Sequence, residues 1–485
     1  MAIRLCESFR IKSQINLTNL PFQFLNVPAL SVKKVFFVLL SLLGSLQMSA
    51  QHIARLRFED DFSYLKHDSL KKAWDEKWKM ISLGKPLKLS IGGEWREQYQ
   101  SYTNVNFGEV PANYVTDSPH QLLNRLMLHA DLQWAQKFRI FAQLNSTIRF
   151  WNPNPITSQV DQNELSVHQL FAEANIAPHS ILRVGQQEHS FGIERFVATR
   201  EGPNTRQTFY GATLKYQYQK NKFTVFLSNP IKMNVGVWDD VRSSEILGGS
   251  YFSHAFKPKL ANLDLYYFYF ESTLREYMFK KGLEKRHTLG FRLYSDLGKF
   301  NYDVELAKQS GTFQDLNIEA FMGVWDFNVS PLRYAYLGFS GNYVPGDASN
   351  TDGELNTFNT LFARPPFGQT VALNISNTLN LSPYIRYQRS NKWIITLRGS
   401  FVNRTQTADG IFTPNMSPLR PIVGKKIDSQ EKELCQIFAL DANFIPTKHW
   451  ALQMEMGYCS AGDYLKDSGI GKNVIYFAAR SSLKF

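Results

Sequence analysis

The chain has 485 residues, three cysteines and a formal net charge of +12 at pH 7. Its mean hydropathy is −0.29, although 14% of its residues are aromatic. A helical membrane protein of this size should contain several apolar runs of about 20 residues, whereas this sequence has one shorter run near its start. Low hydropathy with many aromatic residues instead favours a transmembrane β-barrel, with a soluble all-β protein of several domains as the alternative.

The apolar run predicts a secretory signal peptide over residues 1–50. A pair of lysines precedes an apolar segment of about 12 residues (35–46), and small residues follow it. The segment is too short for a comfortable membrane-spanning helix. We expect cleavage between Ala50 and Gln51, followed by a periplasmic lead-in over residues 51–86. The long stretch ahead of the apolar segment indicates that the start is assigned too far upstream.

Alternating apolar and polar residues predict the strands. In one segment, for example, Leu126 and Leu128 fall on one face and Arg125 falls on the other, as the period of a strand requires. Such segments run for about 11–13 residues, near the length with which a tilted strand crosses a bilayer. Two segments, 262–271 and 317–329, are apolar on both faces, so their orientation stays open. The pattern predicts an all-β fold, an antiparallel up-and-down transmembrane barrel over residues 87–485 with 18 strands, at 88–100, 122–134, 138–150, 165–176, 181–189, 206–218, 223–229, 246–256, 262–271, 285–296, 300–311, 317–329, 333–344, 376–388, 392–403, 432–445, 450–463 and 473–485.

The connections between the predicted strands alternate in length, as they do in bacterial barrels with short periplasmic turns and longer extracellular loops. Trp134, Trp393 and Trp450 lie beside short turns, as an aromatic belt at the periplasmic interface requires. The short turns are predicted at 135–137, 177–180, 219–222, 257–261, 297–299, 330–332, 389–391 and 446–449, and the longer links at 101–121, 151–164, 190–205, 230–245, 272–284, 345–375 and 404–431.

The last predicted strand supports the same fold. Residues 473–485 alternate in polarity and end on Phe485, which resembles the signal that the barrel-assembly machinery reads. This strand must pair with the first one, because an open sheet edge in lipid would leave backbone groups without hydrogen bonds. The sequence therefore predicts a barrel in the outer membrane of a Gram-negative bacterium, in contact with outer-membrane lipid.

The polar faces of the strands carry many charges. Arginine keeps its charge at any relevant pH and binds carboxylates in a bidentate manner. Arginines along the water-filled lumen of a large barrel therefore favour anionic solutes. The alternative is a set of arginine–carboxylate ladders that only stiffen the wall. By parity, the inward basic residues are Arg96, Arg125, Arg139, Arg149, Arg183, Lys215, Arg292, Arg386, Arg398 and Arg480, and the inward acidic residues are Glu94, Asp131, Glu173, Asp303, Glu305, Asp441 and Glu455.

Two segments, 182–216 and 87–100, carry motifs that point to a family. The motif residues are Arg183, Gly185, Gln187 and Glu188 on one strand, Arg200, Gly202, Pro203, Asn204 and Arg206 in the following loop, Gly211 and Ala212 on the next strand, and Gly92, Gly93, Glu94 and Arg96 on the first strand. With these residues the chain resembles the alginate-export family of outer-membrane barrels.

The resemblance implies an electropositive pore that passes an anionic polysaccharide outward, together with periplasmic export partners. The pore would owe its selectivity to Arg96, Arg125, Arg149, Arg183, Arg200 and Arg206. One departure concerns the closure of the pore. All the predicted periplasmic turns are short, whereas an exporter is expected to need a plug or lid. The candidates for this role are the loops at 190–205, 345–375 and 404–431 and the lead-in.

Other functions stay open with less support. A general or small-anion porin fits the same barrel, and the long loops would also suit an adhesin or receptor. We expect no enzyme, because the sequence has no zinc-ligand spacing and no nucleophile motif. A hydrolase inside the barrel would need a Ser–His pair or paired acids. The sequence predicts no cofactor, no metal site and no nucleic-acid partner, since no basic stretch has interleaved aromatic residues.

Cys435 and Cys459 fall on adjacent predicted strands joined by the turn at 446–449. Pairing about that turn sets them almost opposite each other, with both side chains inward. Neighbouring cross-strand positions are within disulfide reach, and the periplasm is oxidising. The two alternatives are a disulfide and a pair of free thiols.

Overall fold

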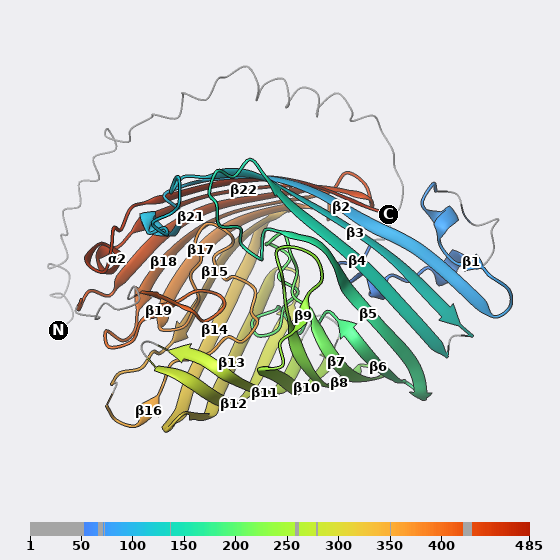
Figure 1. Ribbon diagram of the computed structural model, residues 1–485, viewed down its shortest axis with the longest axis horizontal. Coiled ribbons are helices and arrows are strands. Elements are labelled where there is room, and N and C mark those ends of the chain that lie inside the picture. Colours follow the sequence, from blue (N-terminus) through green and yellow to red (C-terminus); the bar gives the residue numbers. More distant parts are fainter. Residues whose placement is uncertain are drawn as a thin grey trace, which may run out of the picture. The chain divides into compact units, whose positions relative to one another are not determined.

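The computed structural model describes residues 53–485, except 66–70, 72, 136, 258–260, 278–279, 350 and 421–428. The predicted signal peptide lies outside the described residues. Eighteen long strands form a closed antiparallel barrel (Figure 1), which confirms the predicted fold class. The barrel strands are β2 (Leu87–Thr103), β3 (His120–Trp134), β4 (Phe138–Phe150), β5 (Asn163–Ala177), β6 (Ser180–Gln187), β7 (Phe209–Tyr218), β8 (Asn221–Lys232), β10 (Glu245–Lys257), β11 (Ala261–Tyr277), β12 (Lys280–Asp296), β13 (Phe300–Phe313), β14 (Leu316–Leu332), β15 (Ala335–Val344), β17 (Thr378–Arg389), β18 (Trp393–Arg404), β21 (Glu433–Phe444), β22 (Trp450–Ala461) and β23 (Val474–Lys484).

Short helices and strands lie in the lead-in and in the loops. No described helix combines the length and the apolar character that a membrane-crossing helix needs. The 3-10 helices are η1 (Arg57–Glu59), η2 (Ser63–Leu65) and η4 (Glu76–Trp78) in the lead-in and η5 (Val105–Gly108) after β2; the remaining elements are β1 (Ile81–Ser82), β9 (Asp240–Val241), β16 (Glu354–Leu355), β19 (Ile411–Phe412), β20 (Pro418–Arg420) and α2 (Asp463–Asp467).

The first and last strands close the barrel, as predicted. Strand β2 pairs with β23 from Glu94 opposite Lys484 to Thr103 opposite Ile475. The ladder continues at Phe485, which exchanges backbone hydrogen bonds of 2.9 and 3.0 Å with Gly93. Each barrel strand therefore has a neighbour on both sides, and no sheet edge is left open to lipid.

The predicted faces of the β3–β4 hairpin are confirmed. Leu128 and Ile140 expose 45% and 50% of their surface on the outer face, whereas Arg125 and Gln143 are buried on the inner face. Trp134 and Trp393 lie at strand ends beside short turns and are exposed. Apolar and aromatic side chains thus face the surface that contacts lipid.

The two segments that are apolar on both faces lie in β11 and β14. Their inner faces include Phe268 and Met322, which are buried in one apolar cluster with Phe196 and Phe362 from long loops. These strands need no polar inner face, because part of the lumen beside them is filled by protein rather than water.

The predicted long link at 272–284 is wrong. Strands β11 and β12 continue to Tyr277 and from Lys280, and Ser272 pairs with Glu284 within the ladder. The segment extends beyond the apolar band and is therefore rich in charged residues. A charged stretch of sequence without an apolar face is typical of a loop, so the pattern indicated one. The connection between β13 and β14 is also short, at residues 314–315. The short turns at the opposite ends of the strands agree with the prediction.

Three long connections pack together against the inner wall: residues 188–208, termed the inner loop, and the loops at 345–377 and 405–432. Val197 of the inner loop forms a parallel bridge with Phe362, and their backbones exchange hydrogen bonds at Ala198 and Phe196. Residues 421–428 of the third loop lie outside the described residues. Within the described part of the chain, the inner loop makes several charged contacts to the wall.

Cys435 and Cys459 are both buried free thiols. In the ladder Cys435 lies opposite Ala461, and Cys459 lies opposite Ile437. The two cysteines are therefore diagonal neighbours rather than a directly opposed pair, and of the two alternatives the structure has the free thiols.

Candidate functional site

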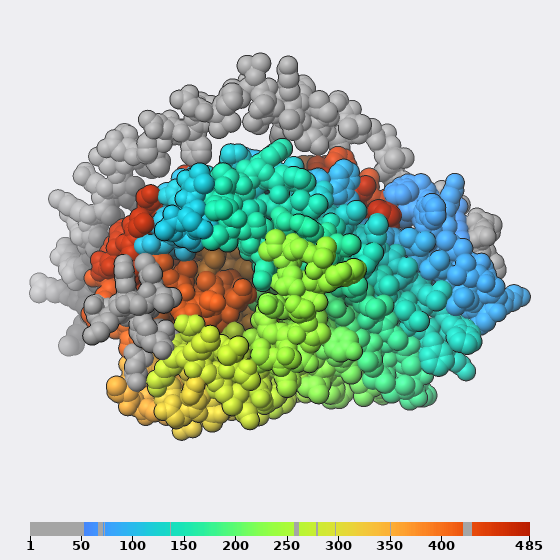
Figure 2. Space-filling view, viewed as in Figure 1, coloured from blue at the N-terminus to red at the C-terminus, as the bar shows by residue number. Residues whose placement is uncertain are grey.

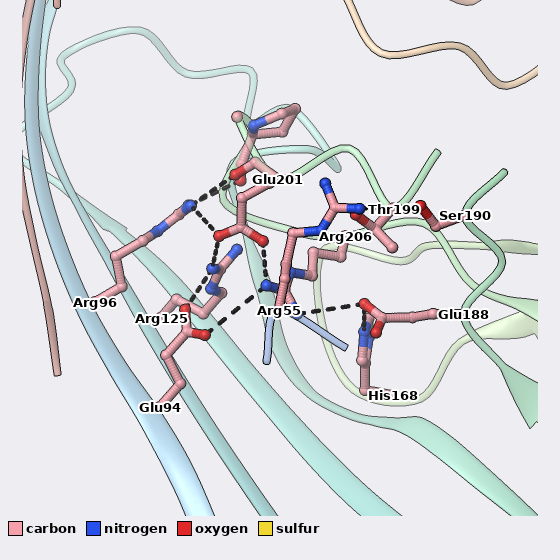
Figure 3. A network of polar contacts seen from close by, with 12 residues as sticks. Arg55, Glu94, Arg96, Arg125, His168, Glu188, Ser190, Thr199, Glu201 and Arg206 are labelled. Atoms are coloured by element: carbon pink, nitrogen blue, oxygen red, sulfur yellow. Dashed lines mark hydrogen bonds and ion pairs between the residues drawn. The ribbon is translucent and has the colours of Figure 1, made fainter. Parts of the chain in front are cut away.

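The inner loop is tied to the barrel wall through the carboxylate of Glu201 (Figure 3). Three guanidinium groups contact this carboxylate: Arg96 on β2, at 3.6 Å, Arg125 on β3, and Arg206 on the loop itself. The three arginine side chains are at most 1% exposed, while Glu201 is 28% exposed. Charge-assisted contacts of this kind are the strongest hydrogen bonds available to a loop.

The backbone of the same loop segment is also bound to the wall. Arg96 donates hydrogen bonds of 2.8 Å to the carbonyls of Glu201 and Pro203 and one of 3.0 Å to Asn204 Oδ1. Asn204 in turn donates to the carbonyl of Asn124 at 3.0 Å. At Gly202 an added Cβ would lie 2.3 Å from Gln369 Nε2, so a larger residue there would require the Gln369 side chain to move. The loop motif found in the sequence therefore consists of groups that fix its position.

Further carboxylates complete the network. Glu94 accepts from Arg125 at 2.5 Å, and Glu188 lies 3.4 Å from Arg206 and 3.0 Å from His168. Three guanidinium groups thus meet three carboxylates. Burial would raise the pKa of Glu201, but Arg125, Arg206 and Arg96 outweigh it and hold the pKa well below its usual range. These charges neutralise each other.

Three of the other predicted lumen arginines are paired with carboxylates in the same way. Arg139 contacts Asp131 at 2.7 Å and Glu173 at 3.2 Å, and Arg183 contacts Glu173 at 2.6 Å. Arg292 contacts Asp303 at 2.6 Å, and also Asp264 at 3.1 Å, a partner that the sequence did not indicate. For these arginines the contacts match the wall-bracing alternative.

The remaining predicted basic residues on the strands are partly exposed, and none forms an ion pair with a described carboxylate. Arg386 and Arg398 flank the ring of Tyr384 at 5.2 and 4.9 Å. Arg480 donates to Gln98 at 2.7 Å and to Gln453 at 2.9 Å. The other two are Arg149, which donates to the carbonyls of Asn154 and Ile156, and Lys215, which lies 5.4 Å from the ring of Phe58.

Of the predicted acidic partners, Asp441 and Glu455 make no ion pair among the described residues. Glu455 instead accepts a hydrogen bond of 2.9 Å from the backbone of Gln369. Glu305 pairs with Arg195 of the inner loop at 2.7 Å. Parity correctly placed these residues on the inner face, but it carries no information on which loop residue they meet.

The lead-in enters the barrel at the end with the short turns. Phe58 is 4% exposed and packs against Phe141 and Phe171, with ring centroids at 6.2 and 5.6 Å. Arg183 lies over the same ring at 4.0 Å, and Arg139 donates to the Phe58 carbonyl at 2.8 Å. Phe58 was not predicted as an anchor, because Phe62 and Tyr64 lie close to it in the same segment and nothing in the sequence distinguishes it from them.

Two arginines flank this anchor. Arg57 is buried and donates to the backbone oxygens of Gly93 and Phe485 at 2.6 and 2.8 Å, across the seam where the barrel closes. Arg55 reaches further and contacts Glu194 and Ser190 of the inner loop at 2.8 and 2.9 Å. The lead-in therefore bridges the wall and the inner loop.

Two acids join the loops at 345–377 and 405–432. Asp409 is fully buried and accepts hydrogen bonds from the Asp347 amide at 2.9 Å and from Thr357 Oγ1 at 2.7 Å. Burial raises the pKa of Asp409 to about 7 and that of Asp347 to about 6. The guanidinium of Arg404 contacts the Asp409 carbonyl rather than its carboxylate.

A model of the family described as alginate export matches residues 87–474. A search of curated proteins found no match. Within the described residues, no group of three or more His, Cys, Asp or Glu side chains is arranged to hold a metal ion.

The fold is similar to solved outer-membrane proteins of Pseudomonas aeruginosa. OccK8 (OprE) is 11% identical with a TM-score of 0.55, and OccK2 (OpdF) in complex with glucuronate is 10% identical with a TM-score of 0.55. OccK5 (OpdH) is 11% identical with a TM-score of 0.52. Each comparison covers 82% of this chain and 98% of the other. At this identity the likeness shows the fold.

The raised pKa of Asp409 leads to a prediction for loop docking. The docked state favours the protonated acid, so its contribution to docking is complete below the ordinary pKa of about 4 and is lost as pH rises to about 7. We expect limited proteolysis of both loops to be several-fold faster at pH 8 than at pH 5, relative to Asp409→Asn at each pH. An equal pH response in Asp409→Asn would contradict this assignment.

Proposed function

The chain belongs to the alginate export family and is a barrel channel of the Gram-negative outer membrane, and on that premise we propose that it passes anionic oligosaccharide or polysaccharide. What supports the proposal is a set of accessible basic side chains that form no ion pair with a described carboxylate. Arg386 and Arg398 are partly exposed without an ion pair to a described carboxylate, and Arg364 of the loop at 345–377 is exposed.

The division of the arginines supports this reading. Where a guanidinium stabilises the fold, as Arg125 and Arg292 do, it has carboxylate partners. Groups without such partners leave a positive potential in the lumen, which attracts anions. The complex of OccK2 with glucuronate adds that a barrel of this architecture accommodates a sugar carboxylate.

A small-anion porin is the second candidate, and one observation favours it. The inner loop and the loop at 345–377 pack tightly against the wall, in an apolar cluster that includes Phe196, Phe362 and Phe268. Such packing narrows the lumen and would restrict passage to small solutes unless these loops move.

We further propose that the lead-in closes the periplasmic side of the channel. Its anchor Phe58 lies among inward-facing rings near the short turns, and Arg55 joins it to the inner loop. The short periplasmic turns offer no other segment of that length at this end of the barrel among the described residues.

Arg386 and Arg398 are expected to contribute to the charge selectivity of the pore. In planar bilayers under a KCl gradient, we expect the wild-type reversal potential to indicate anion selectivity. The double variant Arg386→Gln, Arg398→Gln should lower the anion-to-cation permeability ratio by roughly two- to fivefold, because it removes two exposed charges. Arg333→Gln, at an exposed short turn, serves as the matched control and should have no effect. A cation-selective wild-type pore would refute the proposal. Block by polyuronate, as opposed to free passage of small anions, separates the two candidates.

The substitution Phe58→Ala should loosen the lead-in. Removing the ring leaves a cavity between Phe141 and Phe171 and weakens the anchor, at a cost of about 3–5 kcal/mol for a buried Phe. We expect the single-channel conductance to rise, with more frequent open events. The control is Trp78→Ala, since Trp78 is an exposed aromatic residue of the same lead-in. Equal conductance in Phe58→Ala and wild type would show that the lead-in does not close the channel.

A further inference from the structure

The part of the lead-in at residues 73–82, termed the strap, lies along the first residues of β2. The pairing of β2 with β23 begins at Glu94, and the strap contacts the residues of β2 that come before it. Lys79 Nζ donates to the Ile91 carbonyl at 2.6 Å, and the Met80 amide donates to Ser90 Oγ at 3.0 Å. Strand β1, at the end of the strap, pairs with the start of β2. The strap therefore supplies hydrogen-bonding partners along this edge of the sheet, where unpaired backbone groups are unfavourable.

The strap also contacts the other side of the seam where the barrel closes. The ring of Trp74 lies 5.5 Å from the ring of His449, in the short turn before β22, and 6.0 Å from the ring of Phe485. Lys448 of the same turn lies 3.4 Å from Glu76 Oε1. In the space-filling view the blue lead-in lies next to the red C-terminal strand (Figure 2). The strap thus joins β2 to the β21–β22 turn across the seam.

His449 faces an acceptor with each of its ring nitrogens. Its Nδ1 lies 2.8 Å from the Lys484 carbonyl oxygen, and its Nε2 lies 3.3 Å from Asp75 Oδ1. A backbone carbonyl only accepts hydrogen bonds, so Nδ1 carries a proton, and an unprotonated Nε2 would set its lone pair against the carboxylate. Burial would raise the pKa of Asp75, but His449 and Lys448 outweigh it and hold the pKa below its usual value. His449 therefore completes both contacts only as the protonated imidazolium.

Other charged groups near this pair do not account for a charge change in the same pH range. They are Glu76 and Lys79 of the strap, Lys448 of the turn and Lys484 of β23. Lys448 lies 3.8 Å from Asp75 Oδ1, and Lys484 lies opposite the inward-facing Glu94 in the ladder, so its side chain is on the inner face. Burial lowers the pKa of Lys79 to about 8, so Lys79 is still largely protonated at pH 7.5.

We propose that the strap is a pH-sensitive device, held on the seam while His449 is protonated and loosened when the ring loses its proton. The inference rests on the proposed closure of the channel by the lead-in and adds its regulation. Histidine is the side chain that ordinarily changes charge between pH 5 and 8. Because Asp75 is already ionised at pH 5, the ion pair is complete there and is lost as pH rises toward 7.5.

Hydrogen–deuterium exchange of the full-length protein in detergent, corrected for the intrinsic rate at each pH, measures the strap directly. We expect protection of the amides at 73–82 to fall roughly tenfold between pH 5 and pH 7.5, the size of a lost charge-assisted hydrogen bond. His449→Gln should show the lower protection at both pH values. His179→Asn, at an exposed histidine of another short turn, is the matched control and should keep the wild-type response.

A second variant guards against misfolding of His449→Gln. Asp75→Asn leaves every barrel strand unchanged and removes the charge that faces the ring, so it should also remove the pH response of the strap. Equal protection of the wild-type strap at the two pH values, or a wild-type response in both variants, would overturn the proposal.

Single-channel conductance at the same two pH values separates this inference from the proposed closure. We expect the wild-type conductance to rise at pH 7.5 relative to that of His449→Gln. Protection that depends on pH together with a conductance that does not would refute closure of the channel by the lead-in and leave the role of His449 in holding the strap intact.

Discussion

The ion-pair network around Glu201 is the constraint on which the rest of the interior depends. Its carboxylate meets the guanidinium groups of Arg96, Arg125 and Arg206 in a buried environment. Removing one partner of a buried pair costs about 3–5 kcal/mol, because the remaining charges lose their compensation. With the loop held there, Phe196 and Val197 pack against the wall.

This constraint divides the arginines into two groups with different consequences. Those with carboxylate partners stabilise the loop and wall and contribute little net potential. Those without them, such as Arg386 and Arg398, leave positive charge facing accessible space. The number of inward arginines is therefore a poor measure of selectivity, and the distribution of their partners is the better one. The second group is what supports the proposed channel for anionic saccharides.

Much of the barrel could be predicted from the sequence, because strand periodicity and the need to satisfy backbone groups in lipid leave few alternatives. Parity placed Arg125 and Arg292 correctly on the inner face. It could not identify Glu201 as a partner of Arg125, since period-2 patterns carry no information on contacts with a loop. Asp264 lies directly opposite Arg292 in the β11–β12 ladder, but the segment at 262–271 is apolar on both faces, which left the orientation of Asp264 open. The charged ends of β11 and β12 resembled a loop in sequence, because strands and loops have similar composition beyond the apolar band. The burial of Phe58 and the strands that are apolar on both faces can be explained only from the structure, which places the lead-in and the inner loop against the wall.

The most direct test of this account is the single-channel conductance of Glu201→Gln. The substitution keeps the shape of the side chain but removes the charge that binds three guanidinium groups. Glu97→Gln, a neighbouring acid on the outer face of β2, is the control. We predict a higher mean conductance with frequent fluctuations in Glu201→Gln, as the inner loop leaves the wall, and wild-type traces in Glu97→Gln. Conductance and noise identical to wild type in Glu201→Gln would contradict the role of the network.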